Sequence, residues 1–298
     1  MKRFLTNLLV FLVLLSFSAI ILVVISDLAM QQRKEKLLRI QDNITVVLAG
    51  DSNIESSLND SLIDNSINIA QSGECYIYSY AKIRSLLEYN RQIKTVCLGF
   101  SYRDLIKQTE ELWMYEIIKI SFYNYLLGFS DRALLLRNNP VAYCKGIMQS
   151  IVSNAITFRG SLSLAGANRR IVNFGGYVFL VRDKLQEAIS RFSERPFEKG
   201  LIQEKYLKLI SEECARRSVR LILLNTPKHS YYRSKLDGRF IQNWQAVRNE
   251  LPNDSLLDLS DYNLPDSCFA DLDHLNYRGA RIFSEYINSR LNSDLKGN

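Results

Sequence analysis

The chain has 298 residues, of which 47% are hydrophobic and 23% charged, with 13 glycines and 5 prolines. This is the composition of a folded globular protein, and it excludes collagen-like, low-complexity and intrinsically disordered chains. Lysine and arginine number 38 against 31 aspartates and glutamates, which gives a net charge of +7. That charge favours an anionic neighbour such as lipid headgroups, an acidic polysaccharide or nucleic acid.

The most apolar segment lies at the N-terminus. Residues 4–26 contain no charged side chain, and a helix of that length is roughly 34 Å long, enough to cross a bilayer. The run is longer than the apolar part of a cleaved signal peptide, which is usually about 7 to 15 residues. We therefore predict an uncleaved transmembrane anchor over residues 1–30 and a charged, helix-compatible stalk over residues 31–41.

Lys2 and Arg3 directly precede the apolar run. Basic residues at this position favour an N-terminus on the cytoplasmic side. The expected location is therefore the cytoplasmic (inner) membrane, crossed once, with the rest of the chain facing the periplasm or the cell exterior. The membrane would be contacted through the N-terminal helix.

Short apolar runs alternate with helical segments in the rest of the chain. This alternation is typical of an α/β fold in which a central parallel sheet is covered by helices on both faces, a three-layer α/β/α sandwich. Residues 76–87 are predicted to form an amphipathic helix. The predicted strands are residues 44–49, 66–70, 95–100 and 219–225.

Between about residues 110 and 200 the pattern changes to aromatic and aliphatic residues at helical spacing, with turn signals at residues 138–140 and 175–176. We interpret this region as a helical insertion that packs on the core. A lid over a substrate groove, or a surface that lies against the bilayer, is the alternative. No linker or repeat interrupts the chain, so residues 42–298 are predicted to form one domain with this insertion.

Ser52 is the first candidate for chemistry. It follows the predicted strand at 44–49 in the run Gly50-Asp51-Ser52. In an open parallel sheet, reactive groups collect at the carboxyl ends of the strands. A serine on the tight turn there exposes its hydroxyl beside backbone N–H groups. The same three residue types also suit an ordinary turn, so the serine needs a partner to carry a functional argument.

The chain has only two histidines, His229 and His274. His274 is the better candidate for a general base, because Asp271 precedes it by three residues. On a turn, that spacing lets the carboxylate reach Nδ1 of the imidazole and leaves Nε2 to accept the serine proton. Asp273, next to His274, is expected to point elsewhere.

His229 and Thr226 follow the predicted strand at 219–225 and are expected at the same rim of the sheet. They either line a substrate groove or belong to an ordinary surface loop. The five cysteines show no C-x-x-C spacing, so no metal site is predicted, and no cofactor is expected.

Three segments resemble the conserved blocks of the SGNH/GDSL hydrolase superfamily. They read VVLAGDSNIESS around Ser52, NIAQSGE around Gly73, and DLDHLNYRGARIFSEYI around Asp271 and His274. The resemblance implies a flavodoxin-like fold. It also implies that Ser52 is the nucleophile, that the D-x-x-H pair completes a triad, and that the backbone N–H groups of Ser52 and Gly73 form the oxyanion hole.

The third block of the superfamily, G-x-N-D, departs from the pattern in this chain. Residues 99–104 read GFSYRD, so the asparagine that donates to the oxyanion is missing. Ser101, or Asn53 beside the nucleophile, is the candidate replacement donor.

The order of anchor, stalk and domain resembles membrane-anchored members of this superfamily that act on O-acyl groups of alginate-like polymers and on D-alanyl teichoic acid. We therefore expect an extracytoplasmic serine acyl-ester hydrolase or O-acyl(acetyl)transferase acting on an acylated cell-envelope polysaccharide. A transferase would need a partner protein that delivers the acyl group. The alternatives are a lipase- or lysophospholipase-like esterase and a non-catalytic envelope scaffold. Nucleic-acid binding is not expected, because the basic residues are dispersed.

Overall fold

The computed structural model describes residues 2–163, 175–181, 184–193, 196–251 and 254–296; the side chains of residues 16, 19, 20, 33, 153–163 and 294–296 lie outside the described part. The chain divides into two compact units. One comprises Met1–Arg39 with Tyr115–Asn173, and the other comprises Ile40–Met114 with Phe174–Asn298.

The second unit contains a five-stranded sheet in which every pair of neighbouring strands is parallel. The strand order is β2-β1-β3-β4-β5. The α/β class with a parallel sheet, expected from the sequence, is therefore confirmed. Its strands are β1 (Val46–Ala49), β2 (Ser66–Asn68), β3 (Thr95–Gly99), β4 (Arg220–Asn225) and β5 (Ser255–Asp258).

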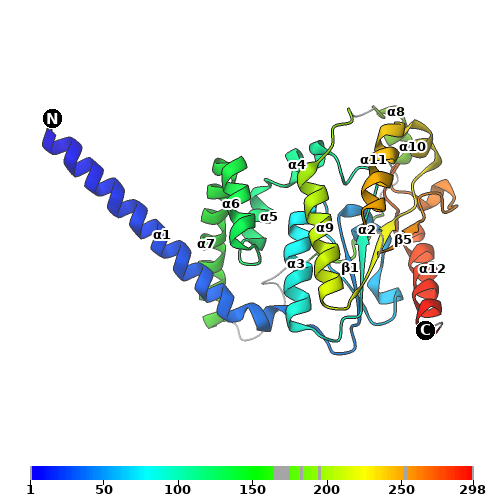
Figure 1. Cartoon of the computed structure of the whole chain (residues 1–298), viewed down its shortest axis with the longest axis horizontal. Helices are drawn as coiled ribbons and strands as arrows, with labels where there is room; N and C mark the ends of the chain where they lie inside the picture. The colour runs from blue at the N-terminus through cyan, green and yellow to red at the C-terminus, as the bar shows by residue number, and fades with distance from the viewer. Residues whose placement is uncertain (1, 164–174, 182–183, 194–195, 252–253, 297–298) are drawn as a thin grey trace. The chain divides into compact units, whose positions relative to one another are not determined.

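Helices flank this sheet. On one side α3 and α9 pack against each other, and on the other side α2 packs against α12 (Figure 1). The longer helices of the unit are α3 (Tyr76–Tyr89), α9 (Leu201–Arg216), α11 (Gly238–Asn249) and α12 (Tyr277–Lys296). The shorter ones are α2 (Ser52–Ser57), α4 (Lys107–Trp113), α8 (Leu185–Ser190) and α10 (Ser230–Lys235), with single 3₁₀ turns at Asp60–Leu62 and Asp266–Cys268.

The sequence accounts for these elements in a direct way. All residues of β1 and β3 are buried, as expected for apolar strands covered on both faces. In α9 the buried residues recur at helical spacing, for example Tyr206, Ile210 and Cys214, which gives the helix one apolar side. The sheet core is therefore built from the same apolar runs that predicted it.

The sheet is extended from β1 toward opposite edges: β2 lies on one side of β1, and β3, β4 and β5 lie on the other. In open α/β sheets the crevice at such a switch point, beyond the carboxyl ends of the strands, is the usual place for a ligand. Here Gly50 directly follows β1, and Gly99 is the last residue of β3. A Cβ on Gly50 would lie 3.1 Å from the backbone nitrogen of Gly99, so the two strand ends approach closely.

The first unit is helical throughout its described part. It comprises α1 (Lys2–Leu38), α5 (Ile117–Tyr123), α6 (Phe129–Asn138) and α7 (Pro140–Ser163). The turn predicted at residues 138–140 is present, because α6 ends at Asn138 and α7 begins at Pro140, a position that suits a residue without an N–H.

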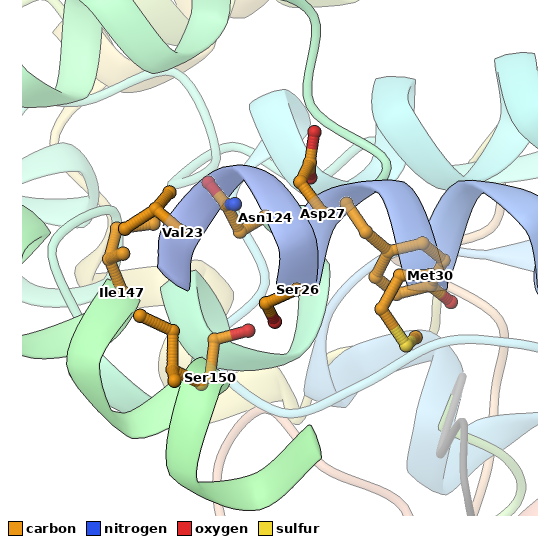
Figure 2. A pocket seen from close by; sticks show the side chains of 9 residues that line it. Val23, Ser26, Asp27, Met30, Asn124, Ile147 and Ser150 are labelled. Carbon is orange, nitrogen blue, oxygen red and sulfur yellow. The ribbon is translucent and has the colours of Figure 1, made fainter. Parts of the chain in front are cut away.

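Side chains of α1 and α7 line a small cavity in this unit. Figure 2 shows Val23 and Ser26 of α1 near Ile147 and Ser150 of α7. Next to them, Asp27 of α1 forms an ion pair with Arg132 of α6, with the closest N···O distance at 2.9 Å. These contacts hold α1 against the helices that follow residue 115.

The predicted membrane anchor over residues 1–30 is not confirmed. Within the described residues, the structure contains no helix that combines the length and the apolar character of a membrane span. The uncharged run at 4–26 lies in α1 and includes residues 16, 19 and 20, whose side chains lie outside the described part. The predicted membrane location stays a prediction.

Candidate active site

The turn after β1 places Ser52 at the first residue of α2. Asp51 caps the helix, and its Oδ1 accepts a hydrogen bond from the backbone N–H of Asn53 at 2.9 Å. Aspartate is among the preferred residues at this position, because its carboxylate satisfies an N–H that has no partner within the helix. The G-D-S-N sequence therefore fixes the start of the helix at the candidate nucleophile.

Ser52, His274 and Asp271 lie in a continuous hydrogen-bonded chain. The Nε2 of His274 is 2.8 Å from Oγ of Ser52. On the other side of the ring, Nδ1 is 2.9 Å and 3.0 Å from the two carboxylate oxygens of Asp271. The structure thus brings together three residues that lie up to 222 positions apart in the chain, in the order nucleophile, base and orienting acid.

The turn that carries His274 is itself held by Asp271. Its Oδ1 accepts the backbone N–H of Asp273 at 3.1 Å and that of His274 at 2.9 Å. An antiparallel bridge between Phe269 and Leu275 closes the same loop. The D-x-x-H spacing therefore lets one carboxylate both shape the turn and orient the imidazole.

Asp273 departs from the expectation that it points elsewhere. Its carboxylate is 3.3 Å from Nδ1 of His274, so two carboxylates face the same ring nitrogen. Burial opposes the charged imidazole, but the charge of Asp273 and the hydrogen bond that the imidazole donates to Asp271 outweigh it and raise the pKa of His274 to about 10. The pKa of Asp273 is lowered: burial acts against ionisation, and the charge of His274 overcomes it.

This arrangement predicts an alkaline shift in the pH dependence of any reaction that uses His274 as a base. The base must be neutral, so kcat/KM should rise as the pH passes through a pKa above the ordinary 6.5 of histidine. Replacing Asp273 by asparagine removes one of the two charges that raise this pKa, and should move the rising limb to lower pH by about one unit. Measured pH profiles of the two proteins check this.

The matched control is Asp266→Asn, because the carboxylate of Asp266 contacts His229 and not His274. Its profile should coincide with that of the unchanged chain. A profile of Asp273→Asn that rises at the same pH as the unchanged chain would show that Asp273 does not set the pKa of the base.

Ser52 and His274 open onto a cavity of about 130 Å³. All the residues that line it belong to the second unit, and they come from the loops and helices that follow the five strands. Its lining includes Ser52, Gly73, Arg103, Trp113, Tyr232 and His274.

Gly73 lies in the wall of this cavity and must be glycine. Its φ of +64° is in the left-handed region, which residues other than glycine rarely adopt. A Cβ at this position would also lie 2.7 Å from Cε3 of the Trp113 ring. Within the described part of the chain, the backbone N–H groups of Ser52 and Gly73 have no hydrogen-bond acceptor.

The two replacement donors expected for the oxyanion, Asn53 and Ser101, donate hydrogen bonds to aspartates instead. The amide nitrogen of Asn53 donates to both carboxylate oxygens of Asp51, at 3.1 Å and 3.0 Å. The hydroxyl of Ser101 donates to Asp104 at 3.0 Å, although Ser101 does line the cavity. In this arrangement, the backbone N–H groups of Ser52 and Gly73 are the free donors of the predicted set.

Asp104, which also lines the cavity, holds Ser101 in place. It accepts the backbone N–H of Ser101 at 2.6 Å and the hydroxyl of Tyr76 at 3.1 Å. Burial, reinforced by the charge of Asp51, raises the pKa of Asp104 to about 7, against the opposing effect of the hydrogen bonds from Ser101. The segment at residues 99–104 is thus held by a buried carboxyl.

Lys228 was not predicted, yet it connects the loop of Ser52 to the loop of His274. Its Nζ donates to the side-chain oxygen of Asn53, next to Ser52, and to the backbone oxygen of Asp273, next to His274, the latter at 3.2 Å. Burial lowers the pKa of this lysine, and the charges of the neighbouring aspartates, Asp273 first, oppose that shift. No motif marked Lys228, because its burial depends on the fold.

His229 and Thr226 do not belong to the residues that line the cavity. His229 is 6% exposed, and its Nδ1 accepts the backbone N–H of Tyr231 at 3.2 Å, so it caps α10. Thr226 is 1% exposed, and its hydroxyl accepts a hydrogen bond from Lys228 at 3.3 Å. Their predicted role in a substrate groove is not supported by these positions.

Asp271, Asp273 and His274 also lie close enough to hold a cation, with one ligand atom from each within 4.8 Å of the others. The ring nitrogen of His274 that would bind such a cation is Nδ1. This nitrogen already faces the carboxylates of Asp271 and Asp273. The geometry is accounted for by the orientation of the imidazole without a metal.

One family model, of an uncharacterised family, matches residues 179–296, which is less than half of the chain. The matched part includes β4, β5, Lys228 and the turn with Asp271 and His274; it excludes Ser52 and Gly73. No curated protein matches the chain. The case for a function therefore depends on the geometry around Ser52.

Proposed function

We propose that the protein is a serine acyl-ester hydrolase or O-acyltransferase of the SGNH type. The hydroxyl of Ser52 attacks the ester carbonyl while Nε2 of His274 takes its proton. His274 then returns the proton to the leaving alcohol, and Asp271 stabilises the imidazolium and fixes its orientation. The backbone N–H groups of Ser52 and Gly73 stabilise the oxyanion.

The observation that carries this proposal is the 2.8 Å contact between Ser52 and His274, continued by Asp271 at 2.9 Å. Forming an ordinary surface turn does not require a serine, a histidine and an aspartate to be hydrogen bonded in sequence at the carboxyl end of a sheet. The strand order and the flanking helices support the finer assignment of the fold as a flavodoxin-like three-layer sandwich with a helical insertion.

The substrate class that we propose is an acylated polysaccharide of the cell envelope, bearing a small acyl group such as acetyl. The cavity of about 130 Å³ supports a small acyl group. Transfer differs from hydrolysis only in whether a sugar hydroxyl or water attacks the acyl-enzyme, and transfer requires a donor that reacylates Ser52.

A non-catalytic scaffold is the second candidate. It is favoured by the engagement of both Asn53 and Ser101, which leaves the oxyanion without a side-chain donor from the predicted set. The loss of one such donor costs about 10²–10³ in rate where nothing replaces it, so the proposed enzyme is expected to be slow rather than inert.

Turnover of a chromogenic acetyl ester separates the two candidates. The unchanged chain should release acetate, and Ser52→Ala should not. Ser289→Ala, which removes an exposed hydroxyl on α12, should match the unchanged chain. A repeat with an added polysaccharide acceptor distinguishes transfer from hydrolysis by the product. Equal turnover by all three proteins would refute the proposed role of Ser52.

A further inference from the structure

The loop after β3 places Arg103 in the wall of the cavity that also contains Ser52 and His274. Its guanidinium carbon is 4.7 Å from the centre of the Tyr232 ring. Tyr232 is 3% exposed, so the ring is held by the fold and offers one face to the cation. Arg103 is thus positioned by stacking, a geometry that suits the planar guanidinium.

Arg103 has hydrogen-bonding capacity that the protein does not use. Its Nε is buried and has no hydrogen-bond acceptor among the described residues. None of the carboxylates in that part of the chain forms an ion pair with its guanidinium. Leaving a buried charged donor unpaired is unfavourable, and a ligand in the cavity would remove that cost.

The acidic side chains of the same cavity wall do not pair with the guanidinium of Arg103. Each accepts hydrogen bonds or forms an ion pair with another group of the protein: Asp51, Glu74, Asp104 and Asp273. The other cation of the wall, Lys228, is buried and donates to three oxygens of the protein. Arg103 therefore differs from the charged groups around it.

We propose that Arg103 binds a carboxylate of the substrate, so that the preferred ester carries a negative charge close to the carbonyl that Ser52 attacks. This inference rests on the proposed function and deepens it. A guanidinium binds a carboxylate through two parallel N–H···O bonds. Arg103 and Ser52 line the same cavity of about 130 Å³, so a carboxylate bound by Arg103 lies close to the ester that Ser52 attacks.

The carboxylate can belong to either half of the ester. In a monoester of a dicarboxylic acid it lies on the acyl group, and in an O-acylated uronic acid it lies on the alcohol. Two pairs of ligands separate these sources. Monomethyl succinate is compared with dimethyl succinate, and an O-acetylated methyl uronoside is compared with its carboxyl methyl ester.

Binding is measured by calorimetry on the full chain carrying Ser52→Ala, which cannot consume the ligands. We expect the charged member of one pair to bind on the order of tenfold more tightly than the neutral member. Adding Arg103→Gln should abolish this preference, and adding Arg103→Lys should restore part of it. Arg281→Gln is the matched control, because Arg281 is 75% exposed and paired with Glu285 on α12.

Equal affinities for charged and neutral members in both pairs would overturn the proposal. So would a preference that survives Arg103→Gln. Because this readout needs no turnover, it is separate from the acetyl-ester assay: an unchanged chain that binds the charged ligand through Arg103 but hydrolyses nothing refutes the enzyme and leaves the carboxylate site in place.

Discussion

A chain with His274 replaced by alanine is expected to hydrolyse acetyl esters on the order of 10⁴-fold more slowly than the unchanged chain. The imidazole lies within hydrogen-bond distance of Oγ of Ser52, at 2.8 Å, and without it the hydroxyl has no base to take its proton. Steady-state kinetics with a chromogenic acetyl ester measure the loss.

The substitution should leave the fold intact. The turn around position 274 is held by backbone bonds that alanine retains, from the N–H of Ala270 to the backbone oxygen of residue 274 at 2.9 Å, and from the N–H of residue 274 to Asp271 at 2.9 Å. The unfolding temperature of the variant should therefore stay near that of the unchanged chain, which shows that the rate loss is chemical.

The second histidine provides the matched control. His229 caps α10 through Nδ1, and asparagine is a good cap residue, so His229→Asn should retain most of the activity. A large loss in His229→Asn together with an active His274→Ala would reverse the assignment of the base.

Lys228→Met is expected to lower kcat by about 10–10²-fold and to lower the unfolding temperature as well. The substitution removes the ammonium that joins the loop of Ser52, through Asn53, to the loop of His274, through Asp273. It leaves buried acceptors without their donor, at a cost of about 1–3 kcal/mol. It also removes a positive charge from a site with several aspartates.

Lys228 acts as a positioning residue, so its effect should also appear in the pH profile. Loss of its charge leaves the neighbouring aspartates less compensated, which favours the imidazolium of His274 and should shift the rising limb of kcat/KM to higher pH. Lys235→Met, at an exposed position of α10, is the control for the loss of one lysine. A kcat and pH profile in Lys228→Met equal to those of the control would contradict the positioning role.

The sequence was sufficient to place the candidate triad because its pieces are local. The strand at 44–49 followed by G-D-S, and the D-x-x-H spacing near the C-terminus, each determine a turn on their own. Parallel pairing then brings the strand ends to one edge of the sheet. Because the chain has only two histidines, few residues could be the base.

Other features of the site arise only from packing. The orientation of Asp273 toward Nδ1, the burial of Lys228 and the stacking of Arg103 on Tyr232 depend on residues from separate loops. Similarly, β5 (Ser255–Asp258) has only four residues, and its pairing with β4 is what makes it a strand. The sequence pattern offers no signal for contacts of this kind.

The helical region was predicted in outline and differs in detail. The insertion predicted at about residues 110–200 contains several separate helices in its described part, among them α5 (Ile117–Tyr123), α6 (Phe129–Asn138) and α7 (Pro140–Ser163). Residues 115–173 group with α1 as a compact unit, an association that helical periodicity alone does not specify. Part of the insertion, residues 164–174, lies outside the described residues.

Covalent labelling by a fluorophosphonate probe tests directly whether Ser52 is an activated nucleophile, because such probes react selectively with activated serines. We expect the unchanged chain to gain one phosphonyl group, and peptide mapping to place it on Ser52. Labelling should disappear in Ser52→Ala and persist in Ser289→Ala. A folded, unchanged chain that takes up no label, or one that is labelled at another residue, would contradict the account.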